Sequence, residues 1–129
     1  MKAIDQVHHD GLGLNDRMTI SADERDPNAG GASHEYVVTF EVDAEVNPAQ
    51  VVAQVQFQHG ARYAPGSTYG VTEAVLCAIL IDRLRAFQSG PFACRENAIA
   101  LTKIEEAHHW LNARAQERAR RGVIGKNEK

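Results

Sequence analysis

Two polar residues in the C-terminal third of the chain, Asn97 and Arg114, are of types that bind nucleotides. An amide can hydrogen-bond a base or a ribose, and a guanidinium can pair with a phosphate. The two residues are 17 positions apart (114 − 97), which is about 25 Å along one helix. No nucleotide-sized ligand spans that distance. A two-fold dimer with antiparallel helices would bring Asn97 near Arg114 of the partner subunit, so the spacing predicts ligand sites shared between subunits.

The stretch that must position these residues, 87–121, has the pattern of a long helix. One face is marked by residues that recur at steps of three and four, namely Asn97, Leu101, Ile104, His108, Leu111 and Ala115. Gly90 and Pro91 predict a break before the helix, with Pro91 just inside its start. Gly122 predicts its end. Cations favour the negative end of a helix dipole, and four arginines gather there: Arg114, Arg118, Arg120 and Arg121.

Another group on this stretch has the residue types of metal ligands: Glu105, Glu106, His108 and His109. The pattern of two histidines at i and i+4 that marks zinc proteases is absent, so an ion pair or a packed histidine is the favoured interpretation. Cys77 lies in an apolar run and behaves as a small hydrophobic residue. Cys94 stands near a helix start, but no base is placed for it. We therefore predict no metal, no cofactor and no catalytic residue.

Two further features could contact a nucleotide. Residues 66–70, Gly-Ser-Thr-Tyr-Gly, precede a predicted helix start, where backbone N–H groups can bind an anion. They lack the GK[ST] ending of a P-loop, so a plain connecting loop is the alternative. Phe87 lies at the end of a predicted helix, where a half-exposed ring can stack on a base. A core position is the alternative for this ring.

Length, charge and cysteine content restrict the class of protein. The 129 residues predict a single domain with a modest core. The net charge of −3 argues against wholesale nucleic-acid binding, although the arginine cluster can still bind a phosphorylated small molecule. Two cysteines predict a reducing compartment without disulfides. The polar N-terminus predicts no signal peptide, and no apolar run approaches the length of a membrane span.

The predicted elements follow the order of an α+β fold, a small antiparallel sheet of three or more strands followed by two helices. Alternation of apolar and polar residues predicts strands at 18–22, 36–42 and 51–58, the last with Ala53, Val55 and Phe57 facing inward.

The helical half of the predicted fold begins at Thr72, which is expected to cap a helix that runs to about Phe87. The apolar run Ala74–Ile81 predicts that this helix is buried. At the two ends of the chain, residues 1–16 predict a flexible arm and residues 123–129 a flexible tail. The long C-terminal helix is expected to pair with its copy at a dimer interface.

The run GPFACREN…LTKIEEAHHWLNAR, residues 90–114, resembles the Thoeris anti-defence type 1 family of phage proteins, and weaker similarity covers residues 18–126. The resemblance implies a sponge, which is not an enzyme, in the cytoplasm of an infected bacterium. Such a sponge binds glycosyl-cyclic ADP-ribose, the signal made by Thoeris TIR proteins, and holds it intact so that the NAD-depleting effector stays off. It also implies capture of CBASS cyclic di- or trinucleotides at separate sites by some members, and dimers grouped as a hexamer.

The resemblance also assigns roles to individual residues. Phe87 would stack on the adenine, Asn97 would hydrogen-bond the base or ribose, and Arg114 would neutralise the diphosphate. A further N-terminal arginine is expected at the phosphates, either Arg25 or, as the alternative, Arg17. The second, cyclic-nucleotide site is expected at the loop 66–70 with Arg62 near it, through a set of five residues: Arg62, Gly66, Ser67, Thr68 and Gly70.

Two other functions remain as alternatives. The Glu105–His109 cluster could belong to an enzyme that degrades the same signal, and recovery of intact ligand would dismiss that hypothesis. The terminal arginines could belong to a nucleic-acid-binding phage regulator, which would show steeply salt-dependent binding to unrelated DNA.

Overall fold

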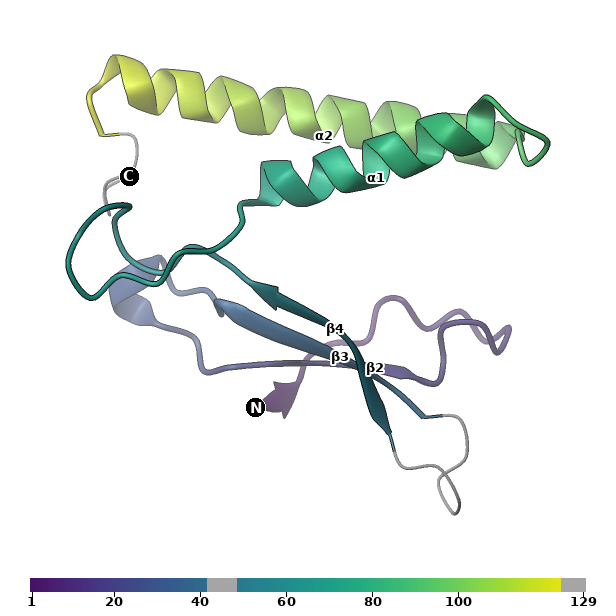
Figure 1. Cartoon of the computed structure of the whole chain (residues 1–129), viewed down its shortest axis with the longest axis horizontal. Helices are drawn as coiled ribbons and strands as arrows, with labels where there is room; N and C mark the ends of the chain where they lie inside the picture. Colours follow the sequence, from purple (N-terminus) through teal and green to yellow (C-terminus); the bar gives the residue numbers. More distant parts are fainter. Residues whose placement is uncertain (42–48, 124–129) are drawn as a thin grey trace. The chain divides into compact units, whose positions relative to one another are not determined.

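The computed structural model describes residues 1–41 and 49–123. The chain divides into two compact units, one of Met1–Gly60 with Ala64–Gly70 and one of Ala61–Tyr63 with the chain from Val71 onward. The first unit is an antiparallel sheet and the second is a pair of helices (Figure 1). This confirms the α+β order that the sequence predicts.

The sheet has four strands in the order β1-β2-β3-β4, all antiparallel. Their bounds are Lys2–Ala3 for β1, Met18–Ala22 for β2, Glu35–Phe40 for β3 and Gln50–Gln56 for β4. The three predicted strands are present, but the second ends at Phe40 and the third at Gln56, so residues 41, 57 and 58 lie outside them. Residue 42 of the second prediction lies outside the described residues. β1 was not predicted, because two residues are too few to show an alternation.

The register aligns apolar residues on one face of the sheet. Val38 lies opposite Ile20 on β2 and opposite Ala53 on β4. A bulge follows, because Thr39 pairs with Val51 and leaves Val52 as an extra residue. Ala53 therefore lies on the predicted face, but its side chain is exposed.

The N-terminal arm runs along β2 through side-chain hydrogen bonds. Gln6 imitates a strand pairing, because its Oε1 accepts from the Ile20 N–H and its Nε2 donates to the Ile20 carbonyl, both at 2.9 Å. His8 and His9 both donate through Nε2 to the Met18 carbonyl, at 2.7 and 2.9 Å. These hydrogen bonds connect the arm to β2 of its own sheet. They do not measure its motion, so the flexibility predicted for residues 1–16 stays a prediction.

The second unit contains α1, Glu73–Gln88, and α2, Arg95–Arg120, which lie side by side and antiparallel (Figure 1). Thr72 caps α1 as predicted, since its side chain accepts from the Val75 N–H. The predicted start of α2 was wrong: Pro91 lies in the connecting turn, and Cys94 is the N-cap, with Sγ 3.4 Å from the Asn97 N–H. Gly122, at φ 76°, follows the end of α2 as predicted.

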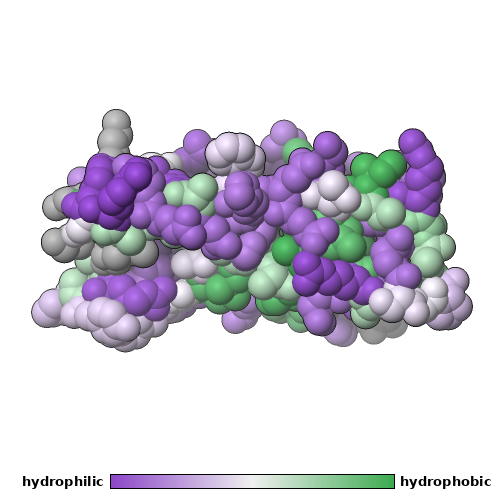
Figure 2. All heavy atoms as spheres, turned by 90° about the horizontal axis from the view of Figure 1, so that it is seen from above, coloured by the Kyte–Doolittle hydropathy of each residue, from purple (hydrophilic) through white to green (hydrophobic). Residues whose placement is uncertain are grey.

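The helical pair buries little apolar surface of its own. Ile81 is the one buried residue of the two helices. The prediction that Ala74–Ile81 is buried was therefore wrong for most of this run, because α1 has a wide apolar face and a single helical partner. Ile79 is 60% exposed, and Trp110 on α2 is 70% exposed. Seen from above, apolar side chains interrupt the polar surface of the molecule in several patches (Figure 2). No helix among the described residues is both long and apolar enough to cross a bilayer.

Gly70, the last residue of the first unit, lies very close to the backbone at the end of β4 and at Phe57. A Cβ at this position would collide with the Phe57 carbonyl carbon and oxygen and with the Gln56 carbonyl oxygen. We expect Gly70→Ala to lower the free energy of unfolding by about 1–3 kcal/mol, the cost of overpacking against atoms that cannot move aside. Urea unfolding measures this change. Gly90→Ala is the control, because a Cβ there would meet the Ala86 and Phe87 carbonyl oxygens only at 3.6 and 3.9 Å, which is ordinary van der Waals contact; an equal loss in both variants would contradict the expectation.

Candidate ligand-binding site

Phe87 and Asn97 lie at the same end of the helical pair. Phe87 is the penultimate residue of α1, and Asn97 is the third residue of α2. Gln88 fixes the connection between them, because its Nε2 donates to the Cys94 carbonyl and its Oε1 accepts from the Cys94 N–H, both at 3.1 Å. Sequence reasoning missed Gln88, since a glutamine at a helix end reads as a solvated residue. The Gln88 clamp fixes the end of the helical pair at which these two predicted ligand groups lie.

The Phe87 ring has one face already occupied. The Arg83 guanidinium lies over this ring, 4.9 Å from the centroid, and the Phe92 ring meets it edge-on at 6.1 Å. Phe87 is half-buried, whereas Phe92 is 71% exposed. Because the guanidinium occupies one face of the ring, a flat ligand that stacks on Phe87 would use the opposite face. Sequence reasoning missed Arg83, although its i, i+4 spacing from Phe87 is a signal for such a contact.

Arg114 lies far from Asn97 on α2. It is the 20th residue of the helix, its side chain is exposed, and the helix rise separates it from Asn97 by about 25 Å. Arg121, seven residues further along the chain (121 − 114), pairs with Glu117 at 2.7 Å. One chain therefore does not bring Asn97 and Arg114 together.

The two candidate N-terminal arginines belong to the first unit. Arg25 lies between β2 and the short 3-10 helix η1, Pro27–Ala29, with an exposed side chain. Arg17 immediately precedes β2, and its carbonyl accepts from the Glu41 N–H at 3.0 Å. Both side chains are exposed, and the choice between Arg25 and Arg17 stays a prediction.

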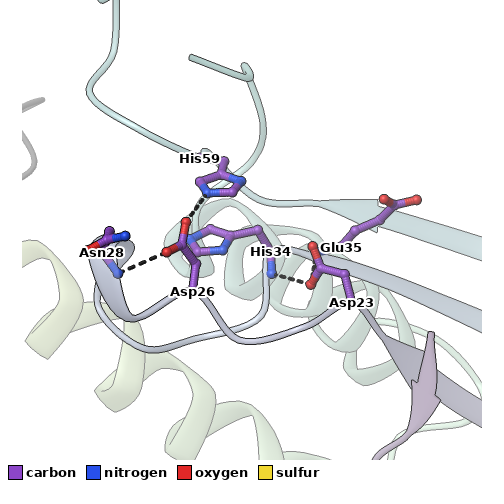
Figure 3. Close-up of polar contacts among 6 residues, drawn as sticks. All are labelled: Asp23, Asp26, Asn28, His34, Glu35 and His59. Atoms are coloured by element: carbon purple, nitrogen blue, oxygen red, sulfur yellow. Dashed lines mark hydrogen bonds and ion pairs between the residues drawn. The ribbon is translucent and has the colours of Figure 1, made fainter. Parts of the chain in front are cut away.

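The turn after Arg25 is built by two carboxylates and two histidines (Figure 3). Asp26 Oδ1 accepts from the Asn28 N–H at 2.9 Å, and Asp26 Oδ2 accepts from His59 Nε2 at 2.8 Å. The His59 ring stacks on His34, with centroids 4.0 Å apart and planes 7° apart. Asp23 Oδ1 accepts from the His34 N–H at 2.9 Å. These contacts connect residues that lie up to 33 positions apart in the sequence.

Both carboxylates are held in their charged forms. The His34 N–H lowers the pKa of Asp23, and the Glu35 N–H adds to this effect. The hydrogen bond from His59 lowers the pKa of Asp26, with help from the Asn28 N–H. A carboxylate that accepts several N–H bonds is easier to keep ionised, because protonation would weaken those bonds.

The lowered pKa of Asp23 predicts a pH dependence of stability. The folded pKa is below the unfolded value of about 3.9, so the stabilisation is fully present above that value and is lost as the pH falls towards the folded pKa. We expect the free energy of unfolding to decrease from pH 5 downwards, and to decrease less steeply in Asp23→Asn. Urea unfolding between about pH 5 and 3 tests this. Asp82→Asn on exposed α1 is the control; equal slopes in both variants would contradict the assignment.

The loop predicted as a second site uses most of its backbone donors internally. The Ser67 N–H donates to the Ala64 carbonyl at 3.2 Å, and the Thr68 N–H donates to the His59 carbonyl at 2.9 Å. The Gly70 N–H donates to Gln58 Oε1 at 3.3 Å. A phosphate at this loop would therefore rely on side chains, of which Arg62 is half-buried. The second site stays a prediction.

The polar residues of α2 that suggested a metal or an enzyme have local partners. Glu105 Oε2 pairs with Arg85 at 2.6 Å and Glu106 with Lys103 at 3.7 Å. The His109 ring meets Trp110 edge-on at 5.4 Å. In residues 1–41 and 49–123, no three His, Cys, Asp or Glu side chains are grouped so that they could hold a metal ion. Cys77 and Cys94 are free thiols.

Comparison with known proteins identifies the helical half of the chain. Residues 53–116, about half of the sequence, match the family described as Acb2/Tad1, hairpin domain. A curated relative, "Thoeris anti-defense 1" of Bacillus phage SBSphiJ7, is 50% identical over 78 residues. That alignment covers 60% of this chain and 54% of the relative, so the chain spans about half the length of the protein it matches. The matched segment includes the Gln88 clamp, Asn97 and Arg114, and the chain belongs to the Thoeris anti-defence family.

Proposed function

We propose that this protein is a phage anti-defence sponge. It binds glycosyl-cyclic ADP-ribose, the cyclic ADP-ribose isomer made by Thoeris TIR proteins, and keeps it from the effector without cleaving it. The proposal draws on the family to which the chain belongs and on the relative named for Thoeris anti-defence. A second site for CBASS cyclic di- or trinucleotides, at Arg62 and the loop 66–70, is part of the proposal.

The observation that carries the proposal is the distribution of ligand groups along the helical pair. A stacking ring and an amide lie at one end, and a free-standing guanidinium lies about 25 Å away on the same helix. Two antiparallel copies of α2 would bring the Phe87–Asn97 end of one subunit to Arg114 of the partner subunit. Each dimer would then hold two equivalent sites. A compact diphosphate ligand suits such a site, because exclusion of water strengthens charge-assisted hydrogen bonds.

Exposed apolar residues support an oligomer of this kind. Val75, Ile79 and Leu80 on α1 and Ile99 and Trp110 on α2 are all more than two-fifths exposed. Exposed groups of large apolar side chains on a helical pair are typical of surfaces that another subunit covers. We propose a homodimer assembled as a trimer of dimers, which sedimentation equilibrium would measure directly.

The first experiment is calorimetric titration of the purified protein with glycosyl-cyclic ADP-ribose, followed by heat release and chromatography of the ligand. A sponge that competes with an effector needs a dissociation constant near nanomolar, about −12 kcal/mol. Tight binding with intact ligand recovered would support the sponge. Recovery of a changed product would instead support an enzyme, and the absence of binding would reject the proposed signal.

A further inference from the structure

We propose that Asp26 and His59 are positioning residues that couple the turn carrying Arg25 to the loop of residues 59–68. The part of this inference that concerns ligand binding rests on the proposed function, because it takes Arg25 as a phosphate ligand. The contacts from which the coupling is argued, between Asp26, His59 and Thr68, lie within the first unit (Figure 3).

Asp26 is anchored within its own turn. Its backbone N–H donates to the Ala32 carbonyl at 3.1 Å, and its carbonyl accepts from the Gly31 N–H at 2.8 Å. Its Oδ1 accepts from the Asn28 N–H at 2.9 Å. The remaining oxygen, Oδ2, is the one that receives His59. Arg25 is joined to this fixed residue by one peptide bond, so the position of Asp26 limits where the guanidinium can go.

His59 is anchored within the other loop. Its backbone pairs with Thr68 in both directions, at 3.0 and 2.9 Å, and this closes the loop between them. The loop is tight, because a side chain on Gly60 would meet Ser67 Oγ at 2.6 Å. The ring of His59 lies flat against His34, which fixes its orientation towards Asp26. The hydrogen bond from His59 to Asp26 therefore joins two segments that are each closed by their own backbone.

Asp26 and His59 can each be substituted without creating a cavity in a hydrophobic core. The side chains of His59 and Asp26 are 39% and 31% exposed. A substitution at either residue that breaks their hydrogen bond removes a tether between the two loops, and it removes little buried packing. Loss of the tether should loosen both loops, including the one on which the changed residue does not lie. That remote effect distinguishes coupling from local support.

The test measures the rate of trypsin cleavage on the loop that does not carry the substitution. Cleavage after Arg25 is measured in variants of His59, and cleavage after Arg62 is measured in a variant of Asp26. His59→Phe keeps a flat ring on His34 but removes the N–H donor, and we expect cleavage after Arg25 to accelerate about tenfold. Asp26→Ala removes the acceptor of this hydrogen bond, and cleavage after Arg62 should accelerate similarly. His59→Gln keeps a donor and should restore slow cleavage. In titrations with glycosyl-cyclic ADP-ribose, His59→Phe should bind about tenfold more weakly and His59→Gln nearly normally.

The outcomes separate the coupling from the proposed function. Unchanged cleavage at both remote arginines would overturn the coupling. Acceleration that extends to Arg17, just before β2, would report unfolding of the whole first unit and would overturn it as well. If remote cleavage accelerates but the wild-type protein does not bind the signal, the coupling stands and the proposed function fails. If the signal binds and His59→Phe binds it normally, the role of the pair in placing Arg25 is wrong.

Discussion

Replacing Arg114 by alanine is expected to weaken capture of the signal strongly and to leave the fold intact. Removal of one partner from a desolvated, hydrogen-bonded charge pair costs about 2–5 kcal/mol, a loss in affinity of roughly 30-fold to several thousand-fold. Arg114 is exposed in the protomer, so its truncation should cost little stability. Calorimetric titration measures the affinity, and urea unfolding measures the stability.

Arg120→Ala is the matched control for this experiment. Arg120 is also an exposed arginine of α2, six residues further along the helix (120 − 114). If both variants lose affinity equally, the effect comes from general positive charge and not from a defined phosphate contact. If Arg114→Ala binds normally, the proposed shared site is wrong even though the chain belongs to the family.

Phe87→Ala is expected to weaken binding by about 1–3 kcal/mol, the typical worth of one base stacked on an aromatic ring. The loss should appear in titrations with glycosyl-cyclic ADP-ribose. Phe87→Trp should retain most of the affinity, because a flat ring remains on the side opposite Arg83. Phe87→Ala also removes the edge contact to Phe92, so the stability of the helical pair must be measured in parallel.

Phe92→Ala separates the two contributions. It removes the same ring–ring contact but leaves the Phe87 face that would receive the base. Because Phe92 is largely exposed, this change should alter affinity much less than Phe87→Ala. Equal losses in the two variants would indicate that the rings act through the shape of the α1–α2 connection.

The elements with strong periodicity could be predicted from the sequence. The alternation in β3 and β4 and the three-and-four spacing along α2 extend over enough residues to define a face. The start of α2 could not, because proline is favoured at helix starts whereas the capping here comes from the thiol of Cys94. The prediction that Ala74–Ile81 of α1 is buried was wrong for a different reason. The sequence shows that this face is apolar, but it does not show which part of the protein, or which partner, covers it.

The sequence could suggest candidate site residues only where ligand chemistry is explicit in the residue type. Asn97, Arg114 and the helix-end Phe87 were proposed in that way, and their ligand roles stay predictions. Gln88 and the Asp26–His59 pair act through geometry, and nothing in their local sequence indicates that glutamine would clamp a turn or that residues 33 positions apart would meet. Contacts of that kind follow from the tertiary fold, and the separation between their partners hides them from local patterns.

The sparse burial in α1 and α2 has a consequence for how this protein accumulates. A helical pair whose one buried residue is Ile81 gains most of its stability from whatever covers Val75, Ile79 and Trp110. If a second copy of the chain covers these residues, the melting temperature rises with protein concentration, and dilution lowers the stability of the folded protein. Newly made chains would then be short-lived while they are scarce and would become long-lived together once their concentration exceeds the dissociation constant of the assembly.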